Sequence, residues 1–176
     1  MLLSDPTHQD MINELDDRVG HLGEFDWEIG PWDKDNYFLA ISPNLDVEKL
    51  QLTKQIIGLA PECSGWHFLP SKPVKEWDGI WEMQNENGKE ISIDTDNWKY
   101  ILYEFDDGTF DIDILVDNIE GNTDTTNLAI DIALTGYLGE EMFITLIQDI
   151  HVVTEFKTES HHRATPIKQI KIILKI

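Results

Sequence analysis

The stretch LAPECSGWHFLPSKP, residues 59–73, brings together residue types that could carry out nucleophilic catalysis. Cys63 is the only cysteine of the chain, and His67 follows it four residues later. A catalytic cysteine must form its thiolate beside a base, and that base usually needs a third group to orient it. The neighbouring Glu62 opposes the formation of a thiolate, and no family-type cysteine signature surrounds Cys63. The sequence therefore predicts no catalytic residue here.

The same residues offer little to a metal ion. Cys63 and His67 supply two ligands, whereas a zinc site uses three or four. The adjacent His161 and His162 would point in different directions on an ordered strand, so they add little. The acidic stretches fail the spacing of a calcium-binding EF-hand loop. We accordingly expect neither a metal site nor a bound cofactor.

A structural interpretation accounts for the residues of this stretch. Pro61 ends the preceding helix, because proline lacks the N–H group that a helix needs. Gly65 permits a sharp reversal, after which Trp66 begins a strand and enters the core. Pro70 ends that strand. The stretch is predicted to be a joint between a helix and a strand.

The elements around this joint are helices mixed with antiparallel hairpins. Amphipathic spacing predicts a helix over residues 10–22, and a second helix begins with Ser42 as its N-cap and ends near residue 59. The pattern predicts a buried apolar helix over residues 127–139 and a further helix over residues 140–150. Hairpins are predicted around Asn87–Gly88 and Asp107–Gly108. This mixture indicates an α+β fold with a mainly antiparallel sheet backed by helices.

The length of 176 residues fits one domain that can bury a sizeable core. No linker rich in serine, glycine or proline divides the chain. We therefore predict a single globular α+β domain over residues 1–176.

The second hairpin places acidic side chains on one face. A two-residue Asp107–Gly108 turn sets Glu104 opposite Asp111 and Leu102 opposite Asp113. Like charges that face each other weaken a sheet. A nearby lysine, a bound cation or a basic partner would offset this cost, and screening by solvent is the simpler alternative. Glu104, Asp111 and Asp113 are therefore candidate partner-binding residues.

Two tryptophans lie in polar surroundings. Trp32 stands in GPWDKD and Trp77 in VKEWDG, and an exposed tryptophan flanked by acidic residues suits an interface anchor. Each could equally fold back onto the core. Trp32 and Trp77 complete the set of candidate partner-binding residues.

The acidic composition limits the kinds of molecule that we expect this protein to bind. With 34 acidic and 13 basic residues the formal charge is −21, which disfavours binding to nucleic acid and to anionic membranes. A basic protein would instead be attracted. A single cysteine and a start without a signal-peptide pattern favour a cytoplasmic location.

The stretches APECSGWHF and YLGEEMFITLIQDI together resemble an uncharacterised bacterial family, domain-of-unknown-function family 695. The family pattern has a proline after a helix, then Gly-Trp entering a strand, and Leu-Gly-Glu in a late apolar helix. The matching residues here are Pro61, Gly65, Trp66, Leu138, Gly139 and Glu140. The resemblance implies an α+β fold but no activity, so it supplies no catalytic residue. Some members are fused to a domain that resembles acidic ribonuclease inhibitors, and we expect no such fusion within these 176 residues.

These observations favour a non-enzymatic acidic binding protein, for example an immunity-type inhibitor of a basic toxin or nuclease. The alternative is an enzyme or a small-ligand-binding protein whose site forms only in three dimensions. The oligomeric state does not follow from the sequence.

Overall fold

The computed structural model describes residues 6–117 and 119–171, with side chains from residue 9 onward. The α-helices are α1 (Pro6–Gly20), α2 (Val47–Gly58), α3 (Thr123–Leu138) and α4 (Glu140–Leu146). The strands are β1 (Asp26–Pro31), β2 (Tyr37–Ser42), β3 (Trp66–Leu69), β4 (Ile80–Gln84), β5 (Glu90–Asp94), β6 (Lys99–Glu104), β7 (Phe110–Leu115), β8 (Ile147–Val152) and β9 (Thr165–Pro166). Most strand pairs are antiparallel, which confirms the predicted α+β class.

The chain divides into two compact units, Met1–Lys72 and Pro73–Ile176. We refer to them as unit 1 and unit 2. Every strand pairs only within its own unit. This division does not by itself test the prediction of one domain over residues 1–176, which stays a prediction.

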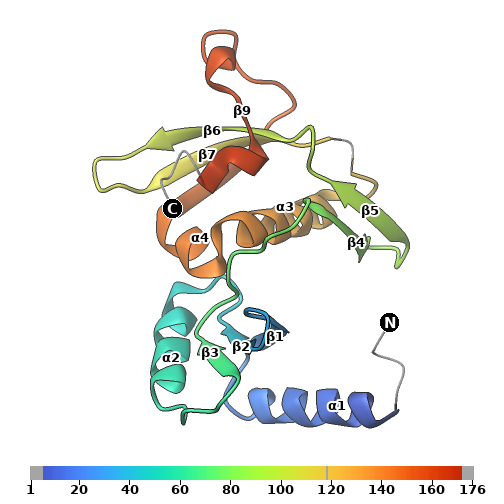
Figure 1. Ribbon diagram of the computed structural model, residues 1–176. Helices are drawn as coiled ribbons and strands as arrows, with labels where there is room; N and C mark the ends of the chain where they lie inside the picture. The colour runs from blue at the N-terminus through green and yellow to red at the C-terminus, as the bar shows by residue number, and fades with distance from the viewer. Residues whose placement is uncertain (1–5, 118, 172–176) are drawn as a thin grey trace. The chain divides into compact units, whose positions relative to one another are not determined.

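Unit 1 is built on the three-stranded sheet β1-β2-β3. β1 and β2 form an antiparallel hairpin, and β3 returns parallel to β2 after the crossover through α2. The helices α1 and α2 lie on different sides of this small sheet (Figure 1). The side nearer α2 is well buried, as Phe38, Ala40 and Leu50 are each at most 6% exposed.

The start of α2 differs from the sequence-based prediction. Ser42 is the last residue of β2 and not the N-cap. The backbone then turns through Asn44 and Leu45 with φ values of 55° and 58°. The Asp46 carboxylate accepts hydrogen bonds from the backbone N–H groups of Glu48 and Lys49, at 2.8 and 2.9 Å. Asp46 is therefore the N-cap, because these left-handed residues delay the helix by one turn.

Unit 2 contains the four-stranded sheet β8-β7-β6-β9 and the separate hairpin β4-β5. As in unit 1, an antiparallel hairpin is followed by a helical crossover and a parallel strand, here β6-β7, α3-α4 and β8. The helices α3 and α4 cover one face of the larger sheet (Figure 1). The core of this unit includes Trp98, Tyr100, Ile112, Ile114, Leu134 and Leu138, which are all at most 2% exposed.

The predicted helix over residues 140–150 is only partly right. α4 ends at Leu146, and residues from Ile147 onward form β8, parallel to β7. The segment IQDIHV contains β-branched residues that fit a strand, and the edge of β7 supplies its hydrogen-bonding partners. Tertiary pairing therefore overrides the helical pattern here.

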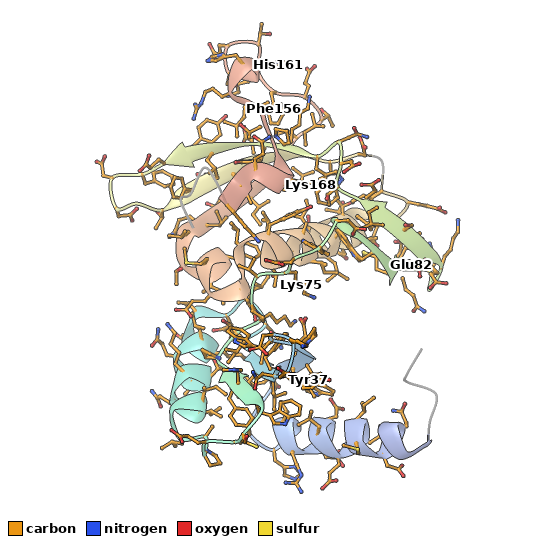
Figure 2. The ribbon with its side chains drawn as sticks, in the orientation of Figure 1. Tyr37, Lys75, Glu82, Phe156, His161 and Lys168 are labelled. Atoms are coloured by element: carbon orange, nitrogen blue, oxygen red, sulfur yellow. The ribbon has the colours of Figure 1, made fainter. Side chains whose placement is uncertain are left out.

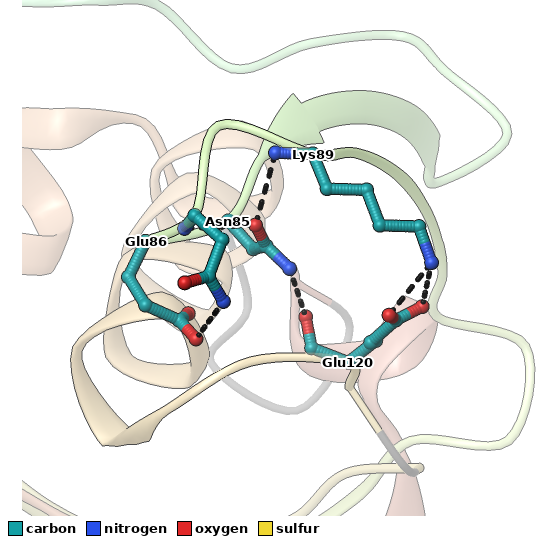
Figure 3. A network of polar contacts seen from close by, with 5 residues as sticks. Asn85, Glu86, Lys89 and Glu120 are labelled. Carbon is teal, nitrogen blue, oxygen red and sulfur yellow. Dashed lines mark hydrogen bonds and ion pairs between the residues drawn. The ribbon is translucent and has the colours of Figure 1, made fainter.

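A polar network joins the β4-β5 turn to the beginning of α3 (Figure 3). The Glu86 carboxylate accepts hydrogen bonds from the Asn122 backbone N–H at 3.0 Å and from the Thr125 hydroxyl at 2.8 Å. Lys89 pairs with Glu120 at 2.6 Å. Asn122, the N-cap of α3, itself accepts a bond from the backbone of Thr125. Glu86 thus places a negative charge at the positive end of the helix dipole.

We expect Glu86→Gln to lower the melting temperature at neutral pH. Hydrogen bonds from its own backbone, from Thr125 and from Asn122 hold the pKa of Glu86 below its ordinary value of 4.5. A lowered folded-state pKa means that the stabilisation is present above pH 4.5 and is lost as the pH falls through the folded-state value. Thermal unfolding at pH 7 and pH 3.5 measures this effect.

The matched control is Glu82→Gln, which changes an exposed glutamate of the same hairpin (Figure 2). Equal melting temperatures for the two variants at pH 7 would contradict the role of Glu86.

Candidate functional site

The β6-β7 hairpin exists as predicted, but its register differs by one residue. Glu104 pairs with Phe110, Tyr103 with Asp111, and Ile101 with Asp113. Backbone hydrogen bonds from Phe105 to Thr109 and from Gly108 to Phe105 enclose a loop of three residues, Asp106 to Gly108, instead of two. The predicted pairing of Glu104 with Asp111 is therefore wrong.

This register separates the three predicted carboxylates. Because side chains alternate along a strand, Asp111 and Asp113 share one face of the sheet with Ile101 and Tyr103. Glu104 lies on the opposite face, across from Phe110. The structure brings together two of the three acidic residues, and whether any of them binds a partner stays a prediction.

Asp113 is engaged within the protein. It accepts a hydrogen bond of 2.8 Å from the Tyr103 hydroxyl. This bond, together with desolvation and the charge of Asp113, raises the pKa of Tyr103. The Arg163 guanidinium lies 5.3 Å from the centre of the Tyr103 ring and donates to the Leu102 carbonyl. Arg163 belongs to the segment between β8 and β9, which contains Phe156 and His161 and lies on the side of β6 and β7 away from α3 (Figure 2).

Asp111 instead belongs to an acidic hollow at the tip of the hairpin, a depression of about 530 Å³. Its acidic residues are Asp106, Asp107, Asp111 and Asp149. Asp111 and Asp149 are neighbours in the parallel ladder of β7 and β8. One carboxylate oxygen of Asp111 is buried and has no hydrogen-bond partner. Hydrogen bonds from the Thr109 side chain and backbone keep the pKa of Asp107 below its ordinary value.

The sequence-based analysis missed Asp149, because it assigned this residue to a helix. The alternation of isoleucine and valine with polar residues in IQDIHV was the available signal for a strand. Placing this strand beside β7 requires the tertiary structure, since β7 and β8 are separated by two helices.

The two candidate tryptophans differ in their surroundings. Trp32 is 47% exposed and contacts the rings of Phe38 and His67, at centroid distances of 6.4 and 5.0 Å. Trp77 is half-buried, stacks on Trp81 at 5.3 Å and lies directly against the backbone of α3. The use of either residue as an interface anchor stays a prediction, and the packing of Trp77 indicates a structural role.

Cys63 and His67 lie on different sides of unit 1. Cys63 is exposed and lines a groove together with Trp66 and Phe68. His67 lies between these two residues in β3 and therefore projects from the other face, against Trp32. The expectation that Trp66 enters the core is wrong, because this side chain is 37% exposed.

This apolar groove lies between α1 and one face of the β1-β2-β3 sheet. Its volume is about 820 Å³. The apolar residues that line it include Met11, Leu15, Trp27, Ile29, Trp66 and Phe68. Glu14 and Arg18 are also in its lining, and they form an ion pair of 2.7 Å with each other. Unit 1 therefore has an open, largely apolar groove that the sequence did not predict.

Within residues 6–117 and 119–171, no three histidine, cysteine, aspartate or glutamate side chains are grouped so that they could hold a metal ion. No helix in this part of the chain has both the length and the apolar character needed to cross a membrane.

The fold and these two surfaces define an α+β protein with an acidic hollow in one unit and an apolar groove in the other. No protein-family model matches the chain, and neither a curated protein nor a solved structure matches it. The resemblance to domain-of-unknown-function family 695 stays a prediction.

Proposed function

We propose that this chain is a non-enzymatic binding protein that captures a basic protein through the acidic hollow of unit 2. The carrying observation is the convergence of Asp106, Asp107, Asp111 and Asp149 on one depression. None of the four forms an ion pair with another of the described residues, and one oxygen of Asp111 lacks any hydrogen bond. Lysine or arginine side chains of a partner would pair with the accessible carboxylates and relieve this repulsion.

The net charge of −21 supports the same function. A surface of one sign accelerates the encounter with a partner of the opposite sign, and the effect decreases with salt. Such a protein needs only a few well-placed contacts and no catalytic group. An immunity-type inhibitor of a basic toxin or nuclease in the cytoplasm is the specific form that we propose.

We expect the double variant Asp111→Asn/Asp149→Asn to lose at least about tenfold in affinity for its basic partner, because charge pairs at an interface are strongly coupled. The immobilised protein is incubated with lysate of the native host at low salt and then washed at high salt. A basic protein that the wild type retains and releases with salt is then titrated against the variant.

The matched control is Glu82→Gln/Glu90→Gln, which removes two exposed carboxylates from the β4-β5 hairpin of the same unit. It changes the net charge by the same amount and should retain the partner. Equal loss in both double variants would show general charge attraction and would contradict a role for the acidic hollow.

A further inference from the structure

The apolar groove of unit 1 exists because α1 covers its sheet incompletely. The helix is held near its C-terminal end, where Val19 is 2% exposed and Asp16 accepts a 3.2 Å hydrogen bond from the Trp27 indole N–H. Toward its other end the apolar side chains do not fill the space above the sheet. Met11 remains 66% exposed and Ile29 remains 43% exposed.

Packing of this kind is unusual for a protein interior. Protein cores are filled to the density of organic crystals, so apolar side chains that face each other across an open groove leave dispersion contacts unmade. A volume of about 820 Å³ lies within the range of about 300–1,000 Å³ that small-molecule sites occupy. The lining also fits such a site, because it is mostly aliphatic and aromatic with few polar groups.

The charged residues near the groove indicate which charge a bound small molecule would carry. Arg18 is the only lysine or arginine in the sequence of α1, and its guanidinium is paired with Glu14 at the groove. The other charged residues of α1, from position 9 onward, are acidic: Asp10, Asp16 and Asp17. An anionic amphiphile such as a fatty acid would be repelled, whereas a cation would be attracted.

The aromatic rings of the groove also favour a positively charged ligand. Trp27, Trp66 and Phe68 all line the groove. The face of an aromatic ring attracts an ammonium group, and tryptophan does so most strongly. The apolar volume, the acidic surroundings and the aromatic faces therefore all favour a ligand that has an apolar part and a positive charge.

We propose that the apolar groove of unit 1 binds a small amphipathic amine. Its aromatic or aliphatic part occupies the space between α1 and the sheet, and its ammonium group lies among the aromatic rings at the acidic rim. This site is separate in sequence from the acidic hollow and goes beyond the capture of a basic protein.

Three probes that share one ring system test the proposal. 1-Naphthylmethylamine is cationic, 1-naphthylmethanol is neutral and 1-naphthoate is anionic at pH 7. Isothermal titration calorimetry on the full chain should give the amine at least a tenfold lower dissociation constant than the alcohol, with the carboxylate weakest. Equal affinities for the three probes, or no binding of the amine up to millimolar concentration, would overturn the proposal.

Two variants locate the site. Ile12→Trp fills the groove with apolar volume and should abolish amine binding, while circular dichroism checks that the fold is retained. Glu14→Gln leaves Arg18 without its partner at the groove, so the amine should bind more weakly and the carboxylate more strongly. Asp35→Asn, in an exposed loop of the same unit, makes the same charge change and should leave both affinities unchanged.

Amine binding that survives Ile12→Trp would place the site elsewhere and overturn the proposal. An Asp35→Asn variant that weakens binding as much as Glu14→Gln would do the same, because only general charge would then matter. The Asp111→Asn/Asp149→Asn variant should bind the amine normally, so failure of the acidic hollow and failure of the groove can be distinguished.

Discussion

Replacing Gly79 by alanine is expected to reduce the free energy of unfolding by about 2–5 kcal/mol. Gly79 has a φ of +81°, a conformation that costs a residue with a side chain about 1–2 kcal/mol. Its added Cβ would also lie 2.1 Å from the Tyr137 hydroxyl oxygen and 2.3 Å from the Thr95 hydroxyl oxygen. Overpacking of this kind costs about 1–3 kcal/mol.

The surroundings of Gly79 leave little room for relaxation. The Thr95 and Tyr137 hydroxyls are hydrogen-bonded to each other at 2.7 Å, and Thr95 also donates to the Gly79 carbonyl. Moving either hydroxyl away from the new methyl group would break these buried bonds. Urea unfolding followed by circular dichroism measures the loss.

Gly88→Ala is the control that separates strain from overpacking. Gly88 also has a positive φ, +72°, but its added Cβ would meet nothing within 4 Å. We expect this variant to lose only about 1–2 kcal/mol. A Gly79→Ala variant no less stable than Gly88→Ala would show that the Thr95–Tyr137 pair can move aside.

Trp98→Ala is expected to cost about 3–5 kcal/mol, the range for truncating a buried large aromatic residue. Trp98 is 1% exposed and meets Trp81 edge to face at 6.3 Å. Its backbone carbonyl accepts a hydrogen bond from Ile167, so this part of the chain is also tied to the C-terminal segment. The cavity left by the indole would be lined by groups that cannot collapse fully.

The control for this prediction is Phe105→Ala, because Phe105 is 46% exposed in the same unit. Its truncation should change the urea midpoint little. A Trp98→Ala variant that unfolds at the same urea concentration as Phe105→Ala would contradict the assignment of Trp98 to the core.

The sequence was sufficient for the fold class and for most elements, because turn signals and periodicity are local. The Asp107–Gly108 pair correctly marked a hairpin, but not the length of its loop. A two-residue loop and a three-residue loop differ by one position in register, and that single step moves Glu104 to the other face. The register depends on which face of the hairpin packs against the core. This is determined by tertiary packing and not by the local sequence.

The candidate surfaces were less predictable for the same reason. Asp149 joins Asp111 only because β8 pairs in parallel with β7 across two intervening helices. Trp66 has the composition of a core residue, yet it lines an open groove. Hydrophobic patterning indicates which residues are stabilised by burial. It does not indicate whether α1 lies close enough to the sheet to bury them.

The acidic residues on the outermost strands of the sheets also oppose aggregation. Strands at the margin of a sheet expose unpaired backbone groups that can recruit a second molecule. Here several marginal strands carry acidic residues: β1 has Asp26 and Glu28, β5 has Glu90 and Asp94, and β8 has Asp149. β1 additionally ends in Pro31, which has no N–H group to donate. Two copies that approached through the same margins would bring like charges together. The acidic residues therefore oppose pairing between the strand margins of two molecules.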